Sequence, residues 1–193
     1  MQSGNSFSLK VTRWLWILTC LVFLLTPGQG TSTTPAPAFK VTTVYLVRHA
    51  EKAATPADNP PLLEAGRERA RKLAQMLSKA GIKTIFASQF LRTQQTAEPL
   101  AQLLGLTSTV LPVSMDTMNP QAVSPQYLKD ITKRIYDNAG QSVLIVGHNN
   151  TVPAIIKELG GDLVPTIPDT EYDNLFVVTV VAKGKAKVAH LRQ

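Results

Sequence analysis

Cysteine is almost absent from this chain of 193 residues, and aromatic residues make up only 6% of it. The single cysteine, Cys20, lies in an apolar stretch near the N-terminus. If that stretch is removed, the chain can form no disulfide, use no thiol nucleophile and offer no cysteine to a metal. Three histidines then offer little for a metal centre, and no basic run with interleaved aromatic residues indicates nucleic-acid binding.

Long apolar runs are also lacking, apart from residues 14–25. That run follows Lys10 and Arg13 and precedes small residues up to Gly30, an order typical of a secretory signal peptide. It is shorter than the roughly 18 apolar residues that span a bilayer comfortably, so we expect cleavage and only transient membrane contact, with an uncleaved signal anchor as the alternative. We therefore expect a secreted or periplasmic protein with a signal peptide at 1–30, a proline-containing linker at 31–40 and one domain at 41–193.

Acidic residues are the minority charge, with 13 Asp and Glu against 20 Lys and Arg and a formal net charge of +7. Cleavage of the signal peptide would lower this charge by two, because Lys10 and Arg13 would leave. The remaining positive excess suits an anionic substrate or an envelope surface, although many ordinary domains carry as much.

Short apolar runs alternate with amphipathic segments along the rest of the chain. The alternation favours an α/β fold, a three-layer sandwich with a mostly parallel central sheet, helices on both faces and a C-terminal β-hairpin. We expect strands at 41–47, 84–87, 107–113 and 142–146, helices at 64–80, 92–104, 125–139 and from Asn150 or Thr151 to Gly160, and a hairpin of 175–181 and 185–191.

Guanidinium and imidazole groups follow three of the predicted strands. Arg48 and His49 end the first strand, Arg92 opens the helix after the second, and His148 follows the fourth. Because the carboxyl ends of parallel strands meet at one edge of a sheet, we expect these four side chains to converge. Each residue alone has an ordinary structural explanation, but together they predict a pocket for a doubly charged anion.

The same residues carry a family resemblance. Residues 46–52 (Leu-Val-Arg-His-Ala-Glu-Lys), 88–97 (Ser-Gln-Phe-Leu-Arg-Thr-Gln-Gln-Thr-Ala) and 146–150 (Val-Gly-His-Asn-Asn) resemble, in order, three motifs of the histidine phosphatase superfamily, also called phosphoglycerate-mutase-like. Residues 60–66 are similar to its segment opening the first helix. The short loops resemble the small open-site members, such as the bacterial phosphohistidine phosphatases.

This resemblance implies an enzyme without a cofactor that hydrolyses small phosphomonoesters. His49 would take the phosphoryl group and pass it to water, Arg48 and Arg92 would bind its oxygens, and His148 would add a hydrogen-bond donor. A backbone amide near Asn149 could also reach phosphate. The alternative is a phosphate- or polyanion-binding envelope protein of the same fold that has lost catalysis. A mutase, which needs a closed site, is disfavoured.

The acid that protonates the leaving group is not evident from the sequence. Many relatives have a glutamate after the third strand, where this chain offers only Asp116. Glu51, two residues after His49, and Glu171 or Asp173 in a late loop are the other candidates, and the choice stays open. Acid phosphatases and phytases typically have an aspartate directly after the second histidine, where Asn149 stands here, so that branch is disfavoured. Neither the physiological substrate nor the oligomeric state follows from the sequence.

Overall fold

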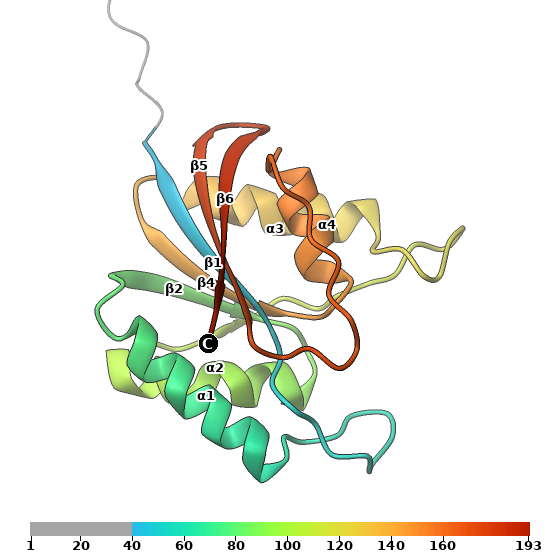
Figure 1. Cartoon of the computed structure of the whole chain (residues 1–193). Coiled ribbons are helices and arrows are strands. Elements are labelled where there is room, and N and C mark those ends of the chain that lie inside the picture. The colour runs from blue at the N-terminus through green and yellow to red at the C-terminus, as the bar shows by residue number, and fades with distance from the viewer. Residues whose placement is uncertain (1–39) are drawn as a thin grey trace, which may run out of the picture. The chain divides into compact units, whose positions relative to one another are not determined.

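A six-stranded sheet organises residues 40–193, which are the residues that the computed structural model describes (Figure 1). The expected signal peptide and nearly all of the expected linker lie outside this range. The strands follow the spatial order β3-β2-β4-β1-β5-β6. Their bounds are β1 (Thr42–Arg48), β2 (Ile82–Ala87), β3 (Thr109–Val110), β4 (Ser142–Gly147), β5 (Asn174–Ala182) and β6 (Lys185–Arg192).

The sheet is mostly parallel, as predicted. Strands β3, β2, β4 and β1 run in one direction, and the hairpin β5–β6 adds two antiparallel strands beside β1. In the ladder, Arg48 lies opposite Gly147 and Ala87 lies opposite Val146. The residues that follow β1, β2 and β4 therefore leave the sheet side by side at one edge.

Strand β3 is much shorter than the predicted strand at 107–113. Only two exposed residues, Thr109 and Val110, pair with β2 at the edge of the sheet. Leu111 still donates a backbone hydrogen bond to Ala87, but Pro112 has no N–H with which to continue the ladder.

Four helices cover both faces of the sheet (Figure 1). Successive side chains of β4 alternate between the faces, since Val143 and Ile145 pack in one core cluster while Leu144 and Val146 pack in the other. This two-sided burial explains the uninterrupted apolar sequence of the strand. The helices are α1 (Glu64–Leu77) and α2 (Leu91–Leu104) on one face, and α3 (Pro125–Asp137) and α4 (Thr151–Glu158) on the other. No helix in residues 40–193 has the length and apolar character needed to cross a membrane.

Candidate active site

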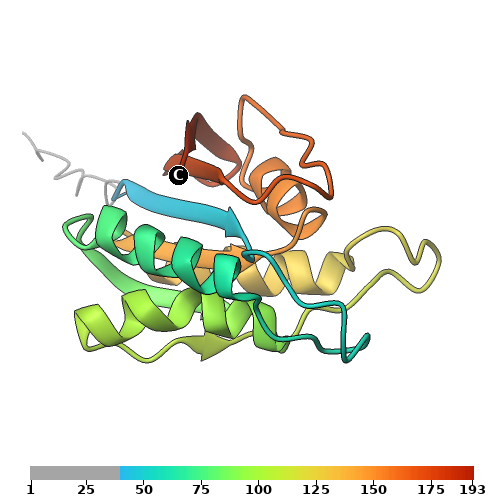
Figure 2. The ribbon, with the colours of Figure 1, turned by 60° about the horizontal axis from the view of Figure 1, so that its bottom comes forward.

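A pocket of about 380 Å³ opens at the carboxyl end of the parallel strands. Three loops leave the sheet at this end, namely those after β1, after β3 and before β5 (Figure 2). Helices α2 and α4 also begin here, so their N-terminal N–H groups and dipoles favour a bound anion. The lining residues are Arg48, His49, Lys52, Phe90, Arg92, Val113, Met115, His148, Asn149, Asn150 and Asp169. The structure thus brings together Arg48, His49, Arg92, His148 and Asn149, whereas Glu51 is not among the lining residues.

His49 is buried with its ring fixed by the backbone. Its Nδ1 lies 2.8 Å from the carbonyl oxygen of Ala50. A carbonyl oxygen can only accept, so Nδ1 carries the proton and Nε2 of the neutral ring keeps its lone pair. Burial, and secondarily the positive charges of Arg92 and Arg48, lower the pKa of His49 to about 4. At neutral pH the ring is therefore neutral, and the lone pair on Nε2 is available.

His148 lies beside His49, with 5.4 Å between the ring centroids. Its Nε2 lies 3.0 Å from Oγ of Ser88, the residue that follows β2. Its backbone N–H donates to Oγ1 of Thr151 at 2.7 Å, which fixes the turn between β4 and α4. Burial and the neighbouring charges lower the pKa of His148 to about 3. Both rings are thus neutral in the empty pocket.

These lowered pKa values predict a stability that depends on pH. The unfolded chain protonates both histidines below about pH 6.5, whereas the folded protein keeps them neutral down to about pH 4. The unfolded state binds more protons in that window, so the free energy of unfolding falls as the pH falls through it. We expect Tm to decrease from pH 6.5 to pH 4, and to decrease less in a His49→Asn/His148→Asn double variant. An equal decrease in both proteins would contradict this account.

Arg48 is held by the loop before β5. Its Nη1 donates to the carbonyl oxygens of Pro168 and Asp169, both at 2.8 Å, and of Glu171 at 3.1 Å. The guanidinium also stacks over the ring of Tyr172, with 4.4 Å from Cζ to the ring centroid. The side chain is only 6% exposed, yet in residues 40–193 its buried Nε–H meets no hydrogen-bond acceptor. One donor of a fixed guanidinium is therefore left for a ligand.

Arg92, which also lines the pocket, likewise has a buried Nε–H without an acceptor in the described residues. It lies in the first turn of α2 and stacks over the ring of Phe90 at 4.2 Å. Burial and the nearby charge of Arg48 lower the pKa of Arg92, so its positive charge is unfavourable in the empty pocket. A bound oxyanion would satisfy both donors and both charges.

Glu51 points to α1. Its carboxylate accepts hydrogen bonds from Nη2 of Arg69 at 2.6 Å and from Nε at 3.0 Å. Partial burial favours the neutral acid, but the hydrogen bonds and charge of Arg69 outweigh it and hold the pKa of Glu51 below its ordinary value. The carboxylate of Glu51 is therefore ionised and paired.

The other three predicted acids also have protein partners. Asp116 accepts the backbone N–H groups of Met118 and Asn119 in the loop after β3. Glu171 and Asp173 both pair with Arg192, at 3.0 and 2.6 Å. None of the three appears among the residues that line the pocket. Within residues 40–193, Asp169 is the only carboxylate in that lining.

Several contributing residues were not singled out by the sequence interpretation. Ser88 contacts His148, and Thr96 accepts the backbone N–H of Ala50 at 3.0 Å, which ties the residue after His49 to α2. Ser88 lies in the second motif, so its position was a usable signal. Asp169 lies in a long loop without a motif, and no local pattern marks it. No group of three or more His, Cys, Asp or Glu side chains in residues 40–193 is placed to hold a metal ion.

Comparison with known sequences agrees with the motifs. The model of the histidine phosphatase superfamily (branch 1) matches residues 44–116. The probable phosphoglycerate mutase GpmB of Yersinia pestis is 40% identical over 75 residues, which cover 36% of this chain and 35% of the mutase. The PE-PGRS family protein PE_PGRS11 of Mycobacterium tuberculosis is 46% identical over 59 residues, 30% of this chain and 10% of that protein. The chain thus matches only a minor part of the length of these curated relatives.

Comparison with solved structures shows the same fold over the described domain. The protein histidine phosphatase SixA, solved with tungstate, is 24% identical, with a TM-score of 0.58 over 78% of this chain and 96% of that one. The putative phosphohistidine phosphatase SixA of Agrobacterium tumefaciens is 25% identical, with a TM-score of 0.51 over 71% and 90%. The phosphoglycerate mutase of Bacillus anthracis is 16% identical, with a TM-score of 0.60 over 79% and 93%.

The matched stretch contains Arg48, His49 and Arg92, and the fold brings His148 to them. Sequence match, fold and pocket therefore agree: over residues 44–116 the chain is similar to the histidine phosphatase superfamily, and the described domain has the fold of the solved histidine phosphatases.

Proposed function

We propose that this protein is a secreted or periplasmic phosphatase that hydrolyses phosphomonoesters through a phosphohistidine on His49. The observation that carries the proposal is the pairing of an unprotonated Nε2 with two guanidinium groups that each have a buried Nε–H without an acceptor in the described residues. Phosphoryl transfer needs alignment and stabilisation of charge on the equatorial oxygens more than it needs other chemistry. This pocket supplies both.

The reaction would run in two steps. Arg48 and Arg92 hold the phosphate oxygens while Nε2 of His49 forms a bond to phosphorus and the bond to the leaving oxygen breaks. Water then attacks the phosphohistidine, and phosphate leaves. His148 donates a hydrogen bond to the transferring group when its ring is protonated beside the bound dianion.

The open pocket also supports a substrate with some apolar surface. Phe90, Val113 and Met115 form part of its lining, next to the phosphate-binding groups. Gln89 holds this wall in place, because its side-chain amide exchanges two hydrogen bonds with the backbone of Val113, at 2.9 and 3.1 Å. An aryl phosphate is therefore a suitable first substrate.

The test is to trap the phosphorylated enzyme. Purified protein mixed with ³²P-labelled aryl phosphate and quenched in alkali, in which phosphohistidine is stable, should carry the label on His49 in peptide mapping. A protein that only binds phosphate would carry no label and would release no phosphate, although its Tm would still rise with inorganic phosphate.

Anion binding gives a separate prediction. One related structure contains tungstate, and we expect tungstate to bind between Arg48 and Arg92 here. At a concentration of about 100 times Kd, it should add roughly 2.7 kcal/mol to the free energy of unfolding. Differential scanning fluorimetry with tungstate, against sodium chloride of equal ionic strength, measures the shift. No specific shift would contradict the anion pocket.

A further inference from the structure

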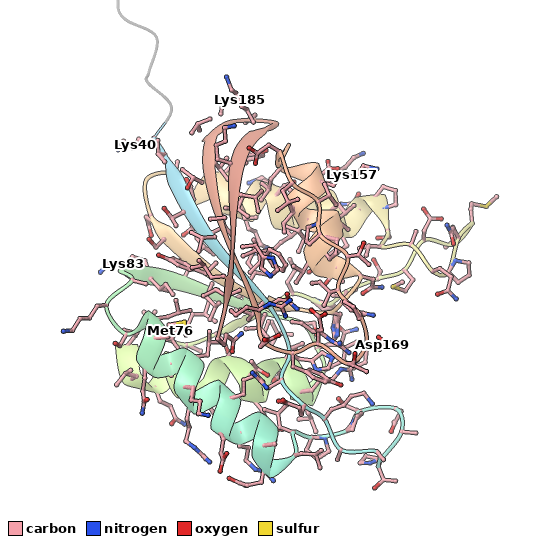
Figure 3. All side chains as sticks on the ribbon, viewed as in Figure 1. Lys40, Met76, Lys83, Lys157, Asp169 and Lys185 are labelled. Atoms are coloured by element: carbon pink, nitrogen blue, oxygen red, sulfur yellow. The ribbon has the colours of Figure 1, made fainter. Side chains whose placement is uncertain are left out.

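Asp169 is a carboxylate in the pocket that holds His49. It lies on the loop between α4 and β5, at the end of the domain opposite Lys40 and Lys185 (Figure 3). This is the end at which Arg48 and His49 leave β1, and Asp169 lines their pocket. The four acids considered from the sequence do not line this pocket, whereas Asp169 lines it together with His49.

Three contacts hold Asp169 beside Arg48 and Asn149. Its Oδ1 accepts a hydrogen bond from Nδ2 of Asn149 at 2.7 Å and lies 3.7 Å from Nη2 of Arg48. Its backbone carbonyl accepts from Nη1 of Arg48 at 2.8 Å. The residue is thus fixed at both backbone and side chain, although the side chain is 86% exposed. That exposure leaves room for a substrate oxygen and for water.

We propose that Asp169 donates the proton that the leaving oxygen takes up when the phosphoryl group moves to His49. This assignment rests on the proposed function. In the first step the bond between Nε2 and phosphorus forms, the bond between phosphorus and the leaving oxygen breaks, and the proton of Asp169 moves to that oxygen. In the second step water attacks phosphorus, gives a proton to the Asp169 carboxylate and releases His49, so the atoms and charges balance.

The substrate itself would supply the proton that Asp169 passes to the leaving oxygen. In the empty pocket the carboxylate of Asp169 faces Arg48, and Arg92, Lys52 and the two histidines share the same cavity. A phosphate bound to Arg48 would lie beside the Asp169 carboxyl, so a proton can pass directly between them. A phosphomonoester that arrives as the monoanion carries the required proton, because its second pKa is about 6. No further co-reactant is needed.

The substitution Asp169→Asn tests the role, because its side-chain oxygen can still accept from Asn149. We expect kcat/KM to fall by about 10²-fold or more with phenyl phosphate, whose leaving group needs a proton. With p-nitrophenyl phosphate, whose leaving group departs as an anion, we expect a change within about threefold. An unchanged tungstate-induced shift in Tm would show that the pocket is intact. The matched control is Asp162→Asn, on the same loop but paired with Lys187, which should lower neither rate.

Four outcomes would overturn the assignment. Equal losses with the two substrates would show that Asp169 positions Arg48 rather than donating a proton. A loss confined to phenyl phosphate in Glu51→Gln, with Asp169→Asn unaffected, would make Glu51 the acid. Absence of phospho-His49 in the unsubstituted protein would overturn the proposed function and this assignment with it. Labelled His49 with no dependence on the leaving group in Asp169→Asn overturns only the assignment.

Discussion

Replacing His49 by alanine is expected to lower kcat/KM with p-nitrophenyl phosphate by about 10⁴-fold or more and to abolish the labelled phosphoprotein. The reason is geometric as well as chemical. The hydrogen bond from Nδ1 to Ala50 leaves Nε2 as the nucleophilic nitrogen. His148, the other imidazole in the pocket, has its Nε2 at 3.0 Å from Ser88. Phosphate release and alkaline-quench labelling measure the two losses.

Two controls separate the loss of a nucleophile from the loss of the fold. The His49→Ala protein should still gain Tm with tungstate, because Arg48 and Arg92 are untouched. His190→Gln removes an imidazole from β6, where it stacks on Phe176 and contacts Asn174, and it should keep its activity. Turnover by His49→Ala within tenfold of the unsubstituted protein, or label on another residue, would contradict the mechanism.

Replacing Arg92 by alanine is expected to lower kcat/KM by about 10²- to 10³-fold, the usual loss when one charge-stabilising donor is removed from a reaction centre. The expected effect on stability is different. Burial and the charge of Arg48 lower the pKa of Arg92, so its charge is unfavourable in the empty pocket. Its removal should therefore leave Tm unchanged or raise it, as expected for a group retained for activity.

A lysine at the same position refines this prediction. Arg92→Lys keeps the charge but loses the planar pair of donors, so it should recover only part of the activity lost in Arg92→Ala. Arg67→Ala, which removes an exposed guanidinium on α1 paired with Glu64, is the matched control and should change neither kcat/KM nor tungstate binding. A large decrease in Tm for Arg92→Ala, or an unchanged kcat/KM, would contradict the assigned role.

The fold was predictable because its signals are local. Runs such as Val143–Val146 alternate between two apolar faces, and helices between them carry one apolar stripe each, so the order of elements follows from periodicity. The third strand was predicted too long, since β-branched residues at 107–110 indicate a strand but do not show that only one neighbour is available at the edge. The number of neighbouring strands is set by the assembled sheet, so the length of this strand could not be predicted from its own residues.

The site residues that directly follow a strand were predictable from the sequence. Arg48, His49 and His148 follow strands that the alternation makes parallel, so their convergence required no side-chain detail. Glu51 shows the limit of this reasoning. It is two residues from His49 in sequence, but its carboxylate pairs with Arg69 on α1, because a loop's side-chain directions depend on what packs against it.

By itself the sequence determined the order of the elements, the edge of the sheet at which the pocket lies and four of the residues that meet there. The tertiary structure decided the protonated nitrogen of His49, the two guanidinium donors without acceptors and the place of Asp169. The physical reason is that these features depend on contacts between segments far apart along the chain. Arg48 is held by carbonyl groups more than a hundred residues away along the chain, and burial, hydrogen-bond partners and local charge exist only after such segments have packed together.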